Sequence, residues 1–192
     1  MDFLLPLALR QRTIEIEGGK VRLRTPRLED FDEWRALREQ SRDFLVPWEP
    51  AWHPDELTRL SYRMRLRHQQ KLMADDAGYA FFIFSSSPEI LLGGITISNV
   101  RRGVAQTGTL GYWIGETFAR HGHMTCAVNA LRNYAFSQLS LRRLEAACLP
   151  SNEASIRLLG RTGFEREGFA KSYLKINGRW EDHILWSCRR DG

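Results

Sequence analysis

The sequence predicts a single-domain mixed α/β fold, of the α+β kind, in which a mostly antiparallel sheet is flanked by about four helices. Three observations favour this fold. The length of 192 residues suits one domain around one core. Three consecutive segments rich in β-branched and aromatic residues predict an antiparallel meander, and a later succession of strand, helix and strand favours one parallel pair. Asn177-Gly178 lies between the last two strand-like segments and predicts a hairpin.

The first forty residues are predicted to form a hairpin and a helix. Apolar and polar residues alternate over 13–16 and over 21–24, on either side of Gly18-Gly19, which is typical of two paired strands. Apolar residues then recur at steps of three and predict a helix over 28–40. The segment 43–54 contains prolines and tryptophans, and we expect a structured loop there because its aromatic side chains need apolar contacts.

The next predicted helix carries much of the positive charge. Pro54 is expected at its start, with acidic residues in the first turn that complement the helix dipole. Its buried side is expected to consist of Leu57, Leu60 and Met64. Residues four apart share one helix face, and here they are Arg59, Arg63, Arg67 and Lys71. This basic face is either a solvated surface or a rim that meets a ribonucleoprotein or an acidic substrate.

The second half of the chain is predicted to supply most of the sheet. Strands are predicted over 79–85, 90–100 and 107–114, then a central helix and a short strand over 143–149. Pro150-Ser151-Asn152 interrupts the pattern before a helix that ends at Gly163. The last two strands are predicted over 164–176 and 179–188.

The most informative segment is 109–124, where a predicted strand passes through a turn into the central helix. The backbone N–H groups of the turn are expected to lack partners and to lie at the positive end of the helix dipole. Such a turn can bind a pyrophosphate. The six residues concerned are Ala119, Arg120, His121, Gly122, His123 and Met124. The alternative is that Gly122 only allows a tight turn to form.

Composition narrows the class of protein. The net charge of +5 favours acidic partners such as phosphates, nucleic acid or an acidic protein surface. No apolar run approaches the roughly 18 residues of a spanning helix, so no membrane partner is expected. The apolar residues 3–9 follow Asp2 and do not resemble a signal peptide. The three cysteines suit reduced thiols in a cytoplasmic enzyme, and His121 and His123 have no further ligand nearby, so no metal is expected.

This order of elements resembles the Gcn5-related N-acetyltransferase (GNAT) superfamily. In that family a turn of consensus Arg/Gln-x-x-Gly-x-Gly/Ala wraps the pyrophosphate of acetyl-CoA. The turn at 119–124 keeps Gly122 and departs from the consensus at its first and last positions. The residues at those two positions resemble the ribosomal-protein N-terminal acetyltransferases. The segments 44–50, 110–115, 164–174 and 180–183 are similar to the ribosomal-protein S5 alanine N-acetyltransferase branch of that group. The resemblance implies a V-shaped splay in the sheet, acetyl-CoA as cosubstrate, an N-terminal extension over 1–20 and an acetyltransferase domain over 21–192.

The resemblance also implies roles for individual residues on the cofactor side. The pantetheine arm is expected to lie along the strand formed by Tyr112, Trp113 and Ile114, next to a β-bulge, and the N–H of Trp113 or Tyr112 is expected to act as oxyanion donor. The side chains of Tyr112 and Trp113 could equally be core. Asn152 is expected to contact the cofactor and Ser155 to protonate the departing thiolate, because Leu159 occupies the usual tyrosine position. Simple capping of the helix is the alternative for both residues.

On the acceptor side the reaction does not require a strong base. An N-terminal amine has a pKa near 7.7 to 8.0, so roughly a tenth of it is neutral at pH 7 and a strong base is unnecessary. Glu49 is the first choice for a carboxylate that receives the proton, with a salt bridge or turn contact as its alternative role, and Trp48 could wall the amine pocket.

The hairpin is expected to form the far wall of the acceptor groove. A two-residue turn at 177–178 predicts Tyr173 opposite Asp182 and Ser172 opposite His183. The alternative is that these pairs only stabilise the two strands.

Three functions follow from this reasoning. The first is direct transfer of acetyl from acetyl-CoA to a protein α-amine, such as the N-terminal alanine of ribosomal protein S5, in the cytoplasm and with possible ribosome association through the basic face. The second keeps the chemistry but takes a small-molecule amine, such as an amino acid, polyamine or antibiotic. The third is a non-catalytic basic ribosome- or RNA-binding module. A groove open at both ends favours the first and a closed acidic pocket the second, while monomer or homodimer stays open.

Overall fold

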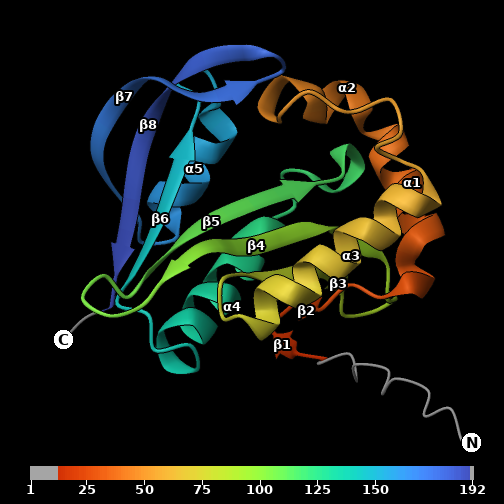
Figure 1. The fold of residues 1–192 in the computed structure, drawn as a ribbon, viewed down its shortest axis with the longest axis horizontal. Helices are drawn as coiled ribbons and strands as arrows, with labels where there is room; N and C mark the ends of the chain where they lie inside the picture. The colour runs from red at the N-terminus through yellow and green to blue at the C-terminus, as the bar shows by residue number, and fades with distance from the viewer. Residues whose placement is uncertain (1–12, 191–192) are drawn as a thin grey trace, which may run out of the picture.

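The computed structural model describes residues 13–190, in which eight strands form one mixed sheet in the order β1-β2-β3-β4-β5-β6-β8-β7 (Figure 1). Every neighbouring pair is antiparallel except β5 and β6, which run parallel. The predicted fold class is therefore confirmed. The strands are β1 (Glu15–Glu17), β2 (Val21–Arg24), β3 (Tyr79–Ser85), β4 (Leu91–Arg101), β5 (Thr107–Ile114), β6 (Arg143–Cys148), β7 (Glu165–Ile176) and β8 (Arg179–Arg189).

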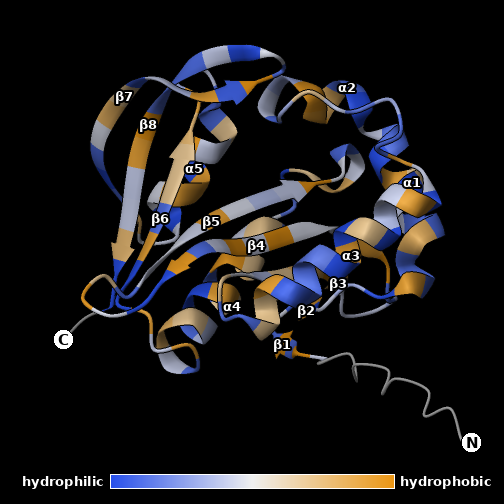
Figure 2. Cartoon of the chain, viewed as in Figure 1, coloured by the Kyte–Doolittle hydropathy of each residue, from blue (hydrophilic) through white to orange (hydrophobic). Residues whose placement is uncertain are grey.

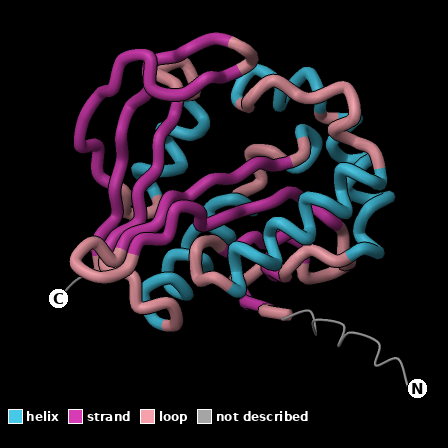
Figure 3. Tube along the Cα trace, in the orientation of Figure 1, coloured by secondary structure: helices cyan, strands magenta, loops and turns pink. Residues whose placement is uncertain are grey.

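Helices cover both faces of the sheet (Figure 3). Phe81 and Ile83 of β3 belong to the apolar cluster under α4, and Phe82 and Phe84 belong to the cluster under α1 and α3. Successive strand residues point to opposite faces, so β3 is buried on both sides, as its unbroken apolar run requires. The helices are α1 (Phe31–Gln40), α2 (Arg42–Leu45), α3 (Arg59–Ala74), α4 (His123–Ser137) and α5 (Glu153–Arg161), with 3-10 turns η1 (Leu28–Asp30), η2 (Val46–Trp48) and η3 (Glu116–Phe118).

The sheet opens between β5 and β6, and this splay positions the site. The two strands pair only over 107–109 and 143–145, whereas the whole of β6 pairs with β8 (Figure 1). Beyond Thr109 the β6 side of β5 therefore has no partner strand within residues 13–190. The predicted β-bulge at 112–114 is wrong, because the β4–β5 register is unbroken from Gly93 opposite Ile114 to Ser98 opposite Thr109. The divergence comes from β6 following β8.

The basic helix differs from the prediction in its start and in its buried side. Thr58 caps α3 by accepting a hydrogen bond from the Ser61 N–H, so the helix begins at Arg59 and Pro54 lies in the preceding turn. Leu60 and Met64 are 67% and 61% exposed, so the expected burial of these two residues is wrong. The buried residues are instead Tyr62, Leu66 and Met73.

Tyr62 explains this rotation of the helix. Its ring packs 4.8 Å from Trp34 and 5.4 Å from Phe31, and its hydroxyl donates to the Arg27 carbonyl. A tyrosine can thus be buried with its polar end satisfied. All four predicted basic residues are exposed along α3, whose ribbon alternates hydrophilic and apolar residues in Figure 2. Arg59 and Lys71 form ion pairs with Asp32 and Asp75.

Two further segments depart from the prediction. The expected loop over 43–54 is helical in its first part, where α2 and η2 follow α1. The hairpin turn forms as predicted, with positive φ at Asn177 and Gly178, and Leu174 lies opposite Glu181. The register then shifts between Ala170 and Leu174, so Ala170, and not Ser172, lies opposite His183.

Asp182 accounts for that shift in register. Ser172 has a φ of 45° and its N–H donates to Oδ1 of Asp182 over 2.8 Å. The side chain of Asp182 therefore takes the place that a ladder partner would have, and the predicted opposition of Tyr173 and Asp182 does not form.

The predicted N-terminal hairpin is confirmed, since β1 pairs with β2 at the edge of the sheet. The division into an extension over 1–20 and a domain over 21–192 stays a prediction, and the apolar residues 3–9 lie outside the described residues. No helix within 13–190 combines the length and the apolar character needed to cross a membrane.

Candidate active site

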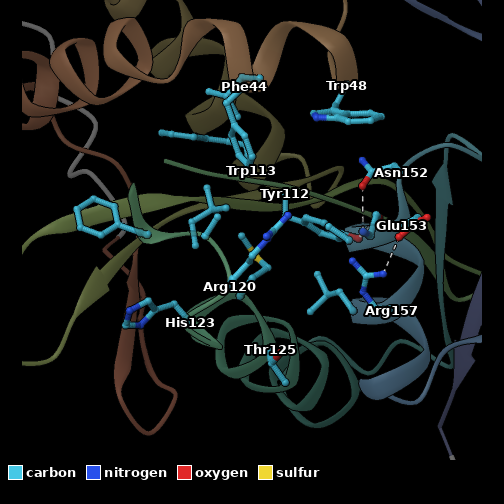
Figure 4. A pocket seen from close by; sticks show the side chains of 18 of the residues that line it. Phe44, Trp48, Tyr112, Trp113, Arg120, His123, Thr125, Asn152, Glu153 and Arg157 are labelled. Atoms are coloured by element: carbon cyan, nitrogen blue, oxygen red, sulfur yellow. Dashed lines mark hydrogen bonds and ion pairs between the residues drawn. The ribbon is translucent and has the colours of Figure 1, made fainter. Parts of the chain in front are cut away.

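A cavity of about 760 Å³ lies at the splay (Figure 4). Four parts of the chain line it: the segment from α2 to Glu49, the end of β5, the turn from 118 to 125, and the segment from Ser151 along α5 to Arg161. Phe44 and Trp48 lie on one side of the β5 residues, with Arg120 and Thr125 on the other. The predicted site residues that line it are Trp48, Glu49, Tyr112, Trp113, Ile114, Ala119, Arg120, Gly122, His123, Met124, Asn152 and Ser155. His121, Tyr173 and Asp182 do not line it.

The turn before α4 has the geometry of an anion site. Gly122 precedes the helix with a left-handed φ of 77°, and no side chain of the described residues caps the helix N-terminus. The first helical N–H groups lack intrahelical partners, and they lie where Gly122, His123 and Met124 line the cavity. Ala119 departs from the prediction, because its N–H donates to the Glu116 carbonyl within η3.

Positive side chains surround this turn. The Lys20 ammonium donates to the His121 carbonyl, and a Cβ on Gly122 would lie 3.3 Å from Lys20 Nζ. Burial lowers the pKa of His123, and the nearby charges of Lys20 and His121 act in the same direction. The basic side chains of Lys20 and Arg120 lie at the turn. Open amides, a left-handed glycine and two cations fit the pyrophosphate of acetyl-CoA.

Lys20 was not among the predicted site residues. It lies in the β1–β2 turn, a hundred residues before the loop that it contacts, and no local pattern marks it. Within residues 13–190, no group of three or more His, Cys, Asp or Glu side chains is placed to hold a metal ion.

The register of β5 decides which backbone groups face the splay. Gly115 N–H donates to the Leu92 carbonyl over 2.8 Å, and hydrogen-bonded pairs alternate along an antiparallel ladder. The N–H of Trp113 therefore points to Gly94 of β4. The N–H groups of Tyr112 and Ile114 point the other way, toward the open side of the strand. Of the two oxyanion donors that the sequence offered, Tyr112 is the one whose N–H faces the cavity.

The side chain of Trp113 packs on the face of the sheet that α1 and α3 cover. It lies over Gly94, where an added Cβ would come within 2.4 Å of its Nε1. Its ring also contacts the guanidinium of Arg38 at 4.9 Å. The indole is therefore part of the core on the α1 side, as the packing alternative for this side chain expected.

Tyr112 and Ser155 form a hydrogen-bonded pair at the floor of the cavity. The Tyr112 hydroxyl lies 2.5 Å from Ser155 Oγ, and Ser155 is only 8% exposed. Burial raises the pKa of Tyr112 well above its ordinary value, and the hydrogen bond with Ser155 acts in the opposite direction. The phenol is therefore neutral at physiological pH and can donate to Ser155. That leaves the Ser155 proton available to a second acceptor.

Asn152 caps α5. Its Oδ1 accepts from the Ser155 N–H over 3.0 Å, so the capping alternative describes this side chain correctly. Asn152 also lines the cavity. The cap fixes the first turn of α5 and with it the direction of the Ser155 side chain, while the amide nitrogen of Asn152 is left for other partners.

Glu49 is held by two side chains. Arg38 donates to both of its oxygens over 2.7 Å, and Trp52 Nε1 donates to Oε2 over 2.7 Å. The salt-bridge alternative is thus present. An ionised carboxylate offers about four lone-pair sites, so three donors leave one for a water or an amine. The role of Glu49 as proton acceptor stays a prediction.

The hairpin reaches this loop through its turn. The Asn177 N–H donates to the Glu49 carbonyl over 2.8 Å, which joins the β7–β8 tip to the segment after η2 (Figure 1). Tyr173 packs against the His183 ring at 5.8 Å. The cross-strand alternative describes these contacts, and acceptor contact by Tyr173 or Asp182 stays a prediction.

Comparison with known proteins bears on this geometry. The acetyltransferase (GNAT) domain family model matches residues 20–165. The ribosomal protein uS5-alanine N-acetyltransferase of Escherichia coli (strain K12) is 35% identical over 173 residues, which cover 86% of this chain and 89% of that protein. The ribosomal-protein-S5-alanine acetyltransferase of Vibrio fischeri has a TM-score of 0.86 at 31% identity and covers 93% of this chain and 97% of its own. Mycobacterium smegmatis RimJ, solved with CoA-disulfide, has a TM-score of 0.84 at 27% identity, with coverages of 92% and 86%.

Proposed function

The chain belongs to the GNAT acetyltransferase family and is an acetyl-CoA-dependent N-acetyltransferase, and we propose that its acceptor is the α-amine of a protein N-terminus. Alanine at the N-terminus of ribosomal protein S5 is the first candidate, because the Escherichia coli relative and the Vibrio fischeri structure, which each match most of this chain, are named for that reaction. The proposal includes a cytoplasmic location and ribosome association through the exposed face of α3.

The charge of the cavity supports a protein acceptor over a small polycation. The cavity lining contains only two carboxylates among residues 13–190, and both are in ion pairs: Glu49 with Arg38 and Glu153 with Arg157. A polyamine or an aminoglycoside would require several unpaired carboxylates to replace its lost hydration. A chain terminus brings one amine and a polar backbone. This pairing of the lining carboxylates is the observation that carries the proposal.

We assign the acceptor chemistry to Glu49 and Trp48. A terminal α-amine is partly neutral at pH 7, so it needs only a nearby group that accepts the proton released after attack. Glu49 lines the cavity, and its three donors leave one lone-pair site of the carboxylate for a further partner. Trp48, which is 37% exposed, would form the wall that limits bulk water around the amine.

On the donor side, acetyl-CoA supplies an activated thioester. In this proposal Tyr112 N–H stabilises the negative charge that develops on the carbonyl oxygen. Ser155, oriented by the Tyr112 hydroxyl, donates its proton to the departing sulfur and regains a proton from solvent after CoA leaves, while Glu49 takes up the proton that the amine releases. Transfer is direct. Burial raises the pKa of Cys148, which lies beneath this site, so its thiol stays protonated and is a poor nucleophile.

A pair of peptides tests the acceptor. We expect CoA release with a synthetic peptide that begins with alanine, and none with the same peptide blocked at its α-amine and containing a free lysine. Turnover of the blocked peptide alone would contradict the α-amine assignment. Turnover of amino acids, polyamines or aminoglycosides in preference to both peptides would favour the small-amine alternative.

A further inference from the structure

Arg38 is a buried cation that connects the parts of the acceptor side. It lies in the last turn of α1 and is 6% exposed. Its two terminal nitrogens each donate to a different oxygen of Glu49 over 2.7 Å. Its guanidinium stacks between two indoles, 4.2 Å from the Trp52 ring and 4.9 Å from the Trp113 ring. One side chain thus joins α1, the loop after η2 and the end of β5.

The loop held by Arg38 also carries the hairpin. Glu49 accepts the Asn177 N–H at its backbone carbonyl and the Arg38 fork at its carboxylate. Trp52 adds a third donor to the same carboxylate. Nε of Arg38 is buried without a hydrogen-bond partner in residues 13–190, so the fork and the two stacked rings are what orient the guanidinium.

The ion pair between Arg24 and Asp30 provides a comparison for the ion pair between Arg38 and Glu49. Arg24 is 5% exposed, donates through a two-point fork to Asp30 at 2.9 and 2.7 Å, and stacks over Phe84 at 4.3 Å. Burial and fork geometry are therefore alike in the two pairs, and each guanidinium stacks on aromatic rings, one for Arg24 and two for Arg38. The pairs differ in position, since Glu49 lines the cavity, whereas Asp30 lies outside it.

We propose that Arg38 is a positioning residue for the acceptor amine, holding Glu49 at the cavity and fixing the loop and hairpin tip around it as one wall. This inference rests on the proposed function, because it requires an acceptor amine to bind next to Glu49. The planar fork fixes both the direction and the plane of the carboxylate. A lysine at this position would keep the charge but contact one oxygen at a time, and would stack poorly on the indoles. The acceptor would then lose its oriented partner while the acetyl-CoA side stays intact.

The test compares Arg38→Lys with Arg24→Lys in the full chain. The acceptor is the alanine peptide, or whichever amine the unmodified enzyme acetylates, so failure of the proposed acceptor is seen in the unmodified enzyme before the variants are compared. We expect Arg38→Lys to lower kcat/KM for the acceptor at least tenfold, with the Kd for acetyl-CoA within twofold. Arg24→Lys should leave both values within twofold at a temperature where it is folded. The pH profile of kcat/KM should shift for Arg38→Lys only.

Two results would overturn the proposal. One is that Arg38→Lys and Arg24→Lys lower the melting temperature equally while both keep the acceptor kinetics of the unmodified enzyme. The other is an acetyl-CoA Kd that weakens as much as acceptor use. If Arg38→Lys does not fold, Trp52→Phe decides, because it keeps an aromatic ring beside Arg38 and removes only the Nε1 donor to Glu49. A severalfold rise in the acceptor KM supports the proposal, and an unchanged KM rejects it.

Discussion

Replacing Ser155 by alanine tests the donor side of the mechanism. The change removes the Oγ that lies 2.5 Å from the Tyr112 hydroxyl and that we propose as proton donor to the departing sulfur. Loss of a general acid typically costs about 10²- to 10⁴-fold in rate. The Tyr112 hydroxyl also loses its partner, which costs about 1 to 3 kcal/mol of unfolding free energy. We therefore expect kcat to fall by at least about a hundredfold in a protein that remains folded.

Tyr112→Phe is the matched control for this change. It removes the other oxygen of the same hydrogen bond and keeps the ring that packs against the core. If the phenol only orients Ser155, the loss is that of one hydrogen bond, about 1.4 kcal/mol or roughly tenfold in kcat. Ser155→Ala should therefore be the slower variant by a wide margin.

The assay is CoA release followed with a thiol reagent, with acetyl-CoA affinity measured separately by calorimetry. Two results would refute the reasoning: a kcat for Ser155→Ala within threefold of the unmodified enzyme at pH 7, or a Tyr112→Phe variant that is equally slow. The second result would make the phenol the proton donor.

Three further predictions concern the turn, a surface ion pair and α3. Gly122→Ala places a side chain at φ 77°, which costs about 1 to 2 kcal/mol. We expect the free turn to relax away from this φ, so that acetyl-CoA binding must restore it and calorimetry shows a roughly 5- to 30-fold weaker Kd; an unchanged Kd would contradict the pyrophosphate role. Hydrogen bonds from Arg143 and Ser187 lower the pKa of Glu167 to about 2, so its stabilisation is complete above pH 4.5 and is lost as pH falls toward 2. Because the pair is partly exposed, this amounts to about 1 kcal/mol or less, and Glu167→Gln should flatten the melting temperature across that window. In urea unfolding, Met64→Gln should change stability by less than about 0.5 kcal/mol and Leu66→Ala should cost about 2 to 5 kcal/mol, since Met64 is 61% exposed and Leu66 only 3%; equal costs would contradict the observed orientation of α3.

The parts of the fold that the sequence predicted are those whose causes are local. The Asn177-Gly178 turn has the positive φ values that this dipeptide favours, and Gly122 is left-handed at the start of α4. Both features arise from a few neighbouring residues. The meander and the helices follow in the same way from apolar periodicity over short windows.

The features that the sequence could not predict arise from distant contacts. The buried side of α3 is set by Tyr62, which fits between two aromatic side chains of α1, and a count of leucines and methionines misses it. The bulge in β7 is set by the Asp182 carboxylate, which replaces a backbone partner. Lys20 and Arg38 reach the site from turns and helices whose local sequence gives no sign of it. Each of these side chains gains its role only when the sheet brings separated segments together.

The oxyanion donor shows most clearly how pairing decides chemistry. Tyr112 and Trp113 are adjacent in the chain and chemically alike, and nothing in their order says which amide is available. The Gly115 N–H bond to Leu92 sets the alternation along β5, which directs the Trp113 N–H to β4 and the Tyr112 N–H to the splay. In the proposed mechanism Tyr112 then contributes twice, through its amide to the carbonyl oxygen and through its hydroxyl to Ser155. Side-chain substitution removes only the second contribution, so the activity lost in Tyr112→Phe measures the part of the hydroxyl and leaves the amide in place.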